Sequence, residues 1–120
     1  MSYPSAIFHE NGVVAFERGT VLTSFAERAR GLIGKRSIEP DKAWVFPRCR
    51  SVHTWLMRVP IDVACLDRRG RVISVCTLPP WRLPHSTVGA TAIIETGAGQ
   101  AAAHGIVEGA TLAWKEPEFV

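Results

Sequence analysis

Short apolar, β-prone runs bounded by turn residues recur along this chain, a pattern typical of β-strands rather than of long helices. The first such runs, residues 7–10 and 13–16, flank the dipeptide Asn11-Gly12. Because Asn and Gly both accept the positive φ angles of a two-residue turn, this segment predicts a β-hairpin.

A second hairpin is expected in the middle of the chain. Residues 61–66 are apolar on both faces apart from Asp62, which predicts a strand that is covered on both sides. The segment from Asp67 to Gly70 supplies a tight turn, with the glycine where a left-handed backbone is needed. Residues 71–76 return as the partner strand.

The remaining pattern predicts further short strands and two short helices. β-Prone runs mark strands at 20–22, 43–46, 90–95 and 111–114. The last of these can close the sheet. One helix is expected over 24–33, where Ser24 and Glu27 form a capping box. Another is expected over 98–104, where Gly105 ends it.

Length and composition, taken together with these elements, indicate the fold class. The chain has 120 residues, of which 47% are hydrophobic, so it can bury a core as a single domain over residues 1–120. No internal repeat or linker divides it. We therefore expect a mainly β protein, α+β by content, with a compact barrel- or sandwich-like sheet and one or two short helices.

Charge and hydropathy narrow the expected partners and location. The net charge of +3 is spread along the chain rather than gathered in a basic tail, so we do not expect nucleic acid as a partner. No apolar run is long enough to predict a membrane span. Residues 1–12 show neither the basic leader nor the apolar run of a signal peptide, so we expect a cytoplasmic protein.

The three cysteines, Cys49, Cys65 and Cys76, lack the C-x-x-C spacing of zinc fingers and thioredoxin-like sites, and reduced thiols are expected. Cys49 and His53 lie four residues apart, which on a helix would bring both within reach of one metal ion. β-Branched and aromatic neighbours before Pro60 favour an extended segment, in which the two side chains would be about 13 Å apart. We therefore expect no metal, with Cys49 and His53 as weak candidates, and no cofactor.

Asp62 is the most informative polar residue of the pattern. A carboxylate inside an apolar strand costs several kcal/mol unless it is paired or hydrogen-bonded. Arg58, across Pro60, is the nearest expected partner, and backbone amides are the alternative. The residue either anchors the loop that enters the strand or lines a pocket together with Arg58.

A ligand cleft is the second chemical feature that the pattern suggests. Pro79 and Pro80 precede Trp81 in a segment that predicts an ordered loop, and arginines accompany the aromatic residues. Aromatic surfaces fringed by cations suit sugars, peptides or anionic ligands. The candidate ligand-binding residues are His53, Trp55, Met57, Arg58, Asp62, Trp81 and Arg82.

Several short segments form a recognisable series. They are RGLIGK at 30–35, FPRCRSVHT at 46–54, MRVPIDV at 57–63, Leu66-Asp67, GRV at 70–72, LPPWR at 78–82, Gly89-Ala90, Gly105 and Gly109. Taken together, from Arg30 to Leu112, this series resembles the domain of unknown function 192 family.

The resemblance implies a compact, mostly β fold, barrel- or sandwich-like, with one or two short helices. It carries over no catalytic residue, because the family has no established activity. Many members are exported and some occur beside pilus-assembly genes, which implies a link to pilus or secretion machinery. This sequence departs from the family at 95–99, where ETGAG replaces Glu-Leu-Pro-Ala-Gly, and at Ala110, where the family has Asp.

Two functional hypotheses follow from these observations. The favoured one is a non-enzymatic accessory domain that binds a small molecule or a partner protein in the aromatic and arginine-lined cleft. The alternative is a small enzyme or metal-binding protein that uses Cys49, His53 and Asp62, in which the thiol would act as nucleophile or ligand.

Overall fold

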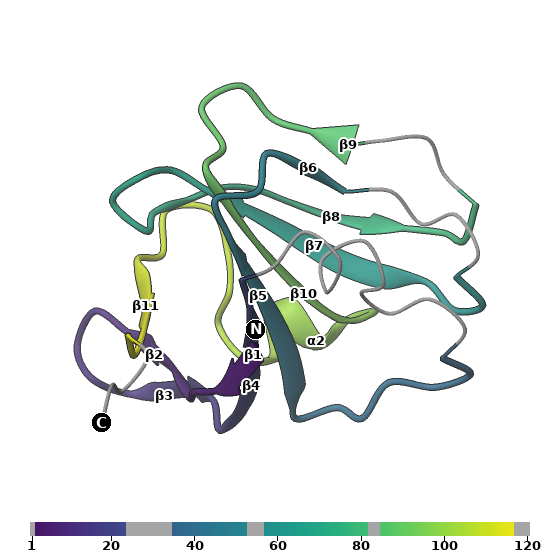
Figure 1. Cartoon of the computed structure of the whole chain (residues 1–120), viewed down its shortest axis with the longest axis horizontal. Coiled ribbons are helices and arrows are strands. Elements are labelled where there is room, and N and C mark those ends of the chain that lie inside the picture. The colour runs from purple at the N-terminus through teal and green to yellow at the C-terminus, as the bar shows by residue number, and fades with distance from the viewer. Residues whose placement is uncertain (1, 24–34, 53–56, 82–84, 117–120) are drawn as a thin grey trace.

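A six-stranded sheet in the order β1-β4-β5-β10-β7-β8 forms the centre of the molecule (Figure 1). The computed structural model describes residues 2–23, 35–52, 57–81 and 85–116. All neighbouring strands of this sheet are antiparallel except β4 and β5, which are parallel. The strands are β1 Ser2–Pro4, β4 Arg18–Leu22, β5 Lys42–Pro47, β7 Ile61–Leu66, β8 Val72–Leu78 and β10 Ala92–Gly97.

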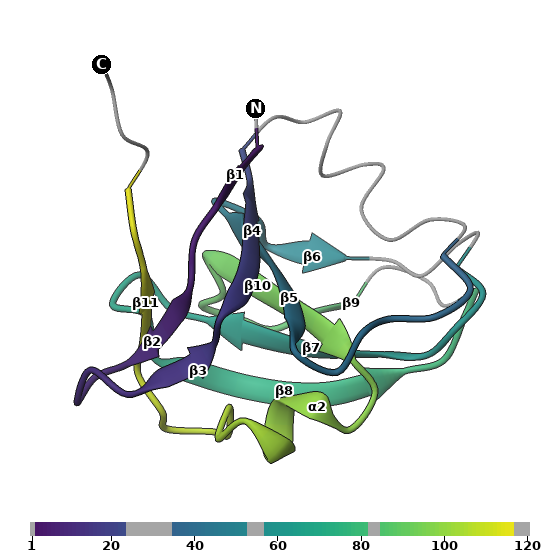
Figure 2. The ribbon, with the colours of Figure 1, turned by 90° about the horizontal axis from the view of Figure 1, so that it is seen from below.

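A smaller sheet and one short helix pack against this sheet. The smaller sheet has the order β11-β2-β3, with β2 at Ile7–His9, β3 at Val14–Phe16 and β11 at Leu112–Trp114. A two-residue pair joins β6 (Ser51–Val52) to β9 (His85–Ser86). Figure 2 shows the helix α2 (Gln100–Ala103) on one side of β7 and β10, and β6 on the other.

Both predicted hairpins are confirmed. β2 and β3 pair across the turn that contains Gly12, whose φ is 87°. β7 pairs with β8 across a turn in which Gly70 has a φ of 82°, and a Cβ atom at Gly70 would lie 2.5 Å from the carbonyl oxygen of Leu112. This close approach, as well as the turn geometry, requires a glycine.

Two elements differ from the sequence-based expectation. The last strand, β11, pairs with β2 in the smaller sheet and does not close the larger one. Its Leu112 side chain is buried between the sheets, so burial of this leucine decides which sheet the strand joins. The helix expected over 98–104 is only the four residues of α2, and Gly105, with a φ of 75°, follows it. The helix expected over 24–33 lies outside the described residues.

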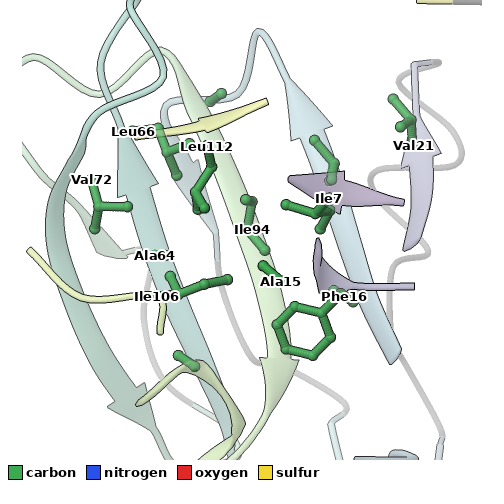
Figure 3. Close-up of a cluster of buried hydrophobic side chains, with 14 residues drawn as sticks. Ile7, Ala15, Phe16, Val21, Ala64, Leu66, Val72, Ile94, Ile106 and Leu112 are labelled. Atoms are coloured by element: carbon green, nitrogen blue, oxygen red, sulfur yellow. The ribbon is translucent and has the colours of Figure 1, made fainter. Parts of the chain in front are cut away.

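The larger sheet has a hydrophobic core on each face, because side chains alternate along its strands. The first core lies between the two sheets and under α2, where Figure 3 shows Ile7, Phe16, Ile94 and other buried side chains gathered. The second core lies on the opposite face. It contains Leu22, Trp44, Phe46, Met57, Ile61, Val63, Cys65, Leu78, Ala90 and Ile93.

The fold is mostly β and sandwich-like, as expected, and the described strands do not form a closed barrel. The described part of the chain has no helix of the length and hydrophobicity that crossing a membrane requires. β7 and β10 have only buried residues, as the continuous apolar run at 61–66 predicts for a strand covered on both sides.

Candidate functional site

Two adjoining hollows lie at one end of the larger sheet, where three connections between strands meet. The register aligns Pro47 at the end of β5, Leu66 at the end of β7 and Ala92 at the start of β10. The segments beyond these residues therefore emerge side by side. The hollows have volumes of about 750 and 500 Å³ and share Arg50, Asp67, Arg68 and Thr91 in their linings.

We call this site the arginine cleft. Among the described residues, four arginines and one carboxylate are the charged ones of its lining. Hydroxyl and glycine residues line the larger hollow, and an indole lines the smaller one. Its charged residues are Arg48, Arg50, Arg68, Arg69 and Asp67. The described lining of the arginine cleft therefore carries more positive than negative charge.

The β7–β8 turn holds one wall of the arginine cleft in place. The amide of Gly70 donates to the carbonyl of Asp67 over 3.0 Å, and the amides of Arg69 and Arg71 donate to Asp67 Oδ1 over 2.8 and 3.0 Å. These hydrogen bonds from Arg71 and Arg69 lower the pKa of the Asp67 carboxyl. Asp67 therefore stabilises the turn through these hydrogen bonds, and Arg68 and Arg69 are exposed at the tip of the turn.

The segment after β5 forms the facing wall. Arg48 has a φ of 65°, a left-handed conformation that costs a non-glycine residue on the order of 1 kcal/mol or more. The chain is held on both sides of it, by the pairing of Pro47 with Ala92 and by the Cys49 amide, which donates to the carbonyl of Thr91 over 3.0 Å. Arg48 and Arg50 are both exposed, so this backbone presents two guanidinium groups beside the hollow.

The remaining walls come from the connection before β10 and from β11. Residues 87–90 form a turn in which the Ala90 amide donates to the carbonyl of Thr87, and Gly89 has a φ of 91°. Thr87 also shares a hydrogen bond of 2.8 Å with the hydroxyl of Ser74 on β8. Trp114 lines the smaller hollow. Its side chain is half-buried and packs partly against the first core.

The described residues of the cleft that was predicted from sequence do not line the arginine cleft, and the predicted cleft itself remains a prediction. Met57 is buried in the second core, Arg58 is exposed, and Trp81 is 63% exposed with a φ of 64°. His53, Trp55 and Arg82 lie outside the described residues.

Asp62 is hydrogen-bonded, although its partner is not Arg58. Its side chain is 4% exposed and points to the face that carries the first core. The hydroxyl of Thr77 donates to Oδ1 over 2.6 Å, and the backbone amide of Ala101 in α2 donates to Oδ2 over 3.1 Å. The expected pairing with Arg58 is therefore wrong, and the alternative of a backbone amide is confirmed, because the strand turns Asp62 toward α2.

The alternative enzyme or metal site requires Cys49 and Asp62 together. Cys49 packs against the second core, whereas Asp62 points to the first, so the sheet separates the two side chains. Cys65 is fully buried and Cys76 half-buried against the second core, and Cys49, Cys65 and Cys76 form no disulfide. Within residues 2–23, 35–52, 57–81 and 85–116, no three histidine, cysteine or acidic side chains gather as a metal site would require.

Sequence reasoning missed two features of the structure. The arginines of the cleft are dispersed in the sequence, where they indicate only a positive charge that is spread along the chain. Their positions at the ends of strands are the only sequence feature that could have indicated a shared site. Trp114, expected only as part of the last strand, also lines the cleft. Glu95 was expected only as the end of a strand, yet it is 4% exposed within β10. Its place after two isoleucines in an alternating strand is the signal that could have shown its burial.

Glu95 is the second buried carboxyl of the sheet. It alternates with Ile93 and so points to the face of the second core, between Trp44 on β5 and Val63 on β7 in the register. Burial raises the pKa of its carboxyl to about 8. At neutral pH the protonated form therefore predominates.

Comparison with known proteins identifies a family that this sequence matches. The model of the domain of unknown function 192 family, described as an uncharacterised ACR, matches residues 8–114. The chain is 40% identical over 81 residues to the UPF0127 protein PH1112 of Pyrococcus horikoshii, covering 62% of this chain and 68% of that protein.

Two solved structures share the fold. A protein of unknown function from Novosphingobium aromaticivorans superposes with a TM-score of 0.76 at 23% identity, over 94% of this chain and 85% of the other. A Sinorhizobium meliloti protein, provisionally described as a transcription regulator, gives a TM-score of 0.72 at 19% identity, over 95% of this chain and 94% of the other. At these identities the likeness concerns the fold alone.

Proposed function

This chain belongs to the domain of unknown function 192 family, and we propose that it is a non-enzymatic binding domain that takes an anionic small ligand in the arginine cleft. The observation that carries this proposal is the convergence of Arg48, Arg50, Arg68 and Arg69 from two separate connections on hollows of about 750 and 500 Å³. Hollows of this size suit ligands no larger than a typical cofactor.

The chemistry of the lining favours phosphate or carboxylate groups. A guanidinium offers several N–H donors in a planar fork that matches two oxygens of such a group. The lining holds one carboxylate, Asp67, and that carboxylate accepts two hydrogen bonds from the turn that carries it. Its negative charge therefore offsets only part of the field of the four arginines.

The backbone of the arginine cleft is also preorganised for binding. Hydrogen bonds fix the turn from Asp67 to Arg71, and the bond from Cys49 to Thr91 fixes the segment that carries Arg48 and Arg50. A site whose backbone is already ordered loses less conformational entropy on binding. The left-handed conformation of Arg48 supports the same interpretation, because strained residues tend to gather at functional sites.

Isothermal titration calorimetry with inorganic pyrophosphate tests this proposal. We expect binding to the full chain at low ionic strength, weakened by added salt, and weakened roughly tenfold by Arg50→Ala or Arg68→Ala, as loss of a charge-assisted hydrogen bond predicts. Both residues belong to the lining shared by the two hollows.

Arg58→Ala is the matched control, because it removes the same charge from an exposed arginine outside the lining of the arginine cleft. Its affinity for pyrophosphate should stay at that of the wild type. If Arg58→Ala weakens binding and the cleft variants do not, the ligand enters the cleft predicted around Arg58 and Trp81. Absence of any binding by the wild type would refute the proposed function.

A further inference from the structure

We propose that the ligand of the arginine cleft is a nucleotide, with its phosphate on the arginines and its base stacked on Trp114. This inference rests on the proposed function and adds to it the class of ligand. It starts from the difference between the two hollows, which share Arg50, Asp67, Arg68 and Thr91 but differ in the rest of their linings.

The larger hollow is suited to a polar, charged group. Its other lining residues include Arg69, Ser86, Thr87 and Gly89, so guanidinium, hydroxyl and backbone groups surround it. The smaller hollow adds Pro47, Ala92 and the indole of Trp114 to its arginines. A ligand that fills both therefore has an anionic part and a flat, weakly polar part.

The backbone is hydrogen-bonded on both sides of Trp114, so the strand that carries the ring has a fixed position. On one side, the Leu112 amide donates to the carbonyl of Gly70 in the β7–β8 turn over 2.9 Å. On the other, the Lys115 amide donates to the hydroxyl of Ser5 over 2.9 Å, and Tyr3 donates to the Lys115 carbonyl over the same distance. Figure 1 shows the β7–β8 turn beside β11, which brings the arginines and this strand together.

The hydrogen bond from the Leu112 amide to the Gly70 carbonyl also holds the arginines of the β7–β8 turn at a fixed separation from Trp114. Gly70 and Leu112 approach so closely that a Cβ atom at Gly70 would lie 2.5 Å from the Leu112 carbonyl oxygen. The turn that carries Arg68 and the strand that carries Trp114 therefore form one unit. Aromatic side chains beside arginines recur where proteins bind nucleotide bases, because every base offers a flat π face.

The size of the hollows favours a mononucleotide over a nucleic acid strand. Volumes of about 750 and 500 Å³ correspond to small-molecule sites. A single strand that binds without sequence preference uses a positively charged groove with successive aromatic side chains, whereas among the described residues one aromatic ring, that of Trp114, lines the cleft.

Calorimetry with three probes separates the parts of this inference: AMP, ribose 5-phosphate and inorganic phosphate. We expect AMP to bind at least tenfold more tightly than ribose 5-phosphate, because only AMP has a base to stack. Trp114→Leu keeps apolar bulk against the first core but removes the ring, and should reduce AMP affinity to that of ribose 5-phosphate. Trp114→Phe keeps a smaller ring and should lie between the two.

Trp81→Leu is the matched control, because it removes an exposed indole outside the lining of the cleft; AMP affinity should not change. Equal binding of AMP and ribose 5-phosphate, with both sensitive to Arg50→Ala, would overturn the nucleotide while leaving an anion site. Binding of AMP that Trp114→Leu does not weaken would likewise overturn it. A single-stranded octanucleotide that binds far more tightly than AMP would overturn it in favour of nucleic acid. If none of the three probes binds, the proposed function fails as well.

Discussion

Asp62 and Glu95 place two carboxyl groups in neighbouring strands of one sheet, equally buried but on opposite faces. Each side chain is 4% exposed. Asp62 points toward α2 and the first core, where the Thr77 hydroxyl and the Ala101 amide donate to it. Glu95 points into the second core, and desolvation raises the pKa of its carboxyl to about 8.

The difference shows that two equally buried carboxyls can have different hydrogen-bond surroundings. Both groups lose water, but hydrogen-bond donors compensate for the loss at Asp62. At Glu95 burial is the cause of the pKa shift. We therefore expect Asp62 to stabilise the attachment of α2 to the sheet, and Glu95 to destabilise the folded state at alkaline pH.

The largest expected effect is the pH dependence that Glu95 imposes. Below its ordinary pKa of 4.5 the carboxyl is protonated in both states; between 4.5 and about 8 the unfolded chain releases the proton and the folded chain keeps it. Stability therefore falls as pH rises through this window, by about 4 kcal/mol between pH 5 and pH 9. Urea unfolding of the wild type at several pH values measures the change.

Glu95→Gln is the matched variant, since it keeps the shape of the side chain but does not ionise. The difference in unfolding free energy between wild type and Glu95→Gln should shift in favour of the variant as pH rises from 5 to 9. A difference that does not change with pH would show that Glu95 meets water or a donor in solution.

Asp62→Ala should destabilise the protein by about 3 kcal/mol, because it removes two hydrogen bonds and leaves the buried Ala101 amide without its acceptor. Asp62→Asn keeps an oxygen for that amide and should cost less than half as much. Thermal and urea unfolding at one pH provide both values.

Arg58→Ala distinguishes this account from the pairing expected from sequence. Arg58 is exposed, so its removal should change stability by no more than about 0.5 kcal/mol. A loss of stability as large as that of Asp62→Ala would support the ion pair between Arg58 and Asp62. It would contradict the hydrogen bonds from Thr77 and Ala101 to Asp62.

A loss between those of Asp62→Ala and Arg58→Ala is expected at Thr77, which lies opposite Asp62 in the register of β7 and β8. Thr77→Val keeps the β-branched shape that suits a strand and removes only the hydroxyl donor. Because Thr77 is exposed, water can replace that donor, and we expect a loss of about 1 kcal/mol in urea unfolding. No loss at all would mean that the Ala101 amide alone satisfies the Asp62 carboxyl.

Much of the fold could be predicted because its signals are local. The Asn11-Gly12 turn, the Asp67–Gly70 turn and the apolar run of residues 61–66 each specify a structure within a few residues. The site was less predictable. Arg48 and Arg50 are separated from Arg68 and Arg69 by two strands and a connection, so only the pairing of β5 and β7 with β10 brings them together.

The sequence by itself determined most of the strands, the two hairpin turns, the family and the fact that an acidic residue lies within an apolar strand at Asp62. The tertiary structure decided which face each buried carboxyl meets, that β11 joins the smaller sheet, and that arginines from distant segments line one cleft with Trp114. The physical reason is range: alternation and turn geometry act between near neighbours, whereas these outcomes depend on strand pairing and core packing between residues far apart in the chain.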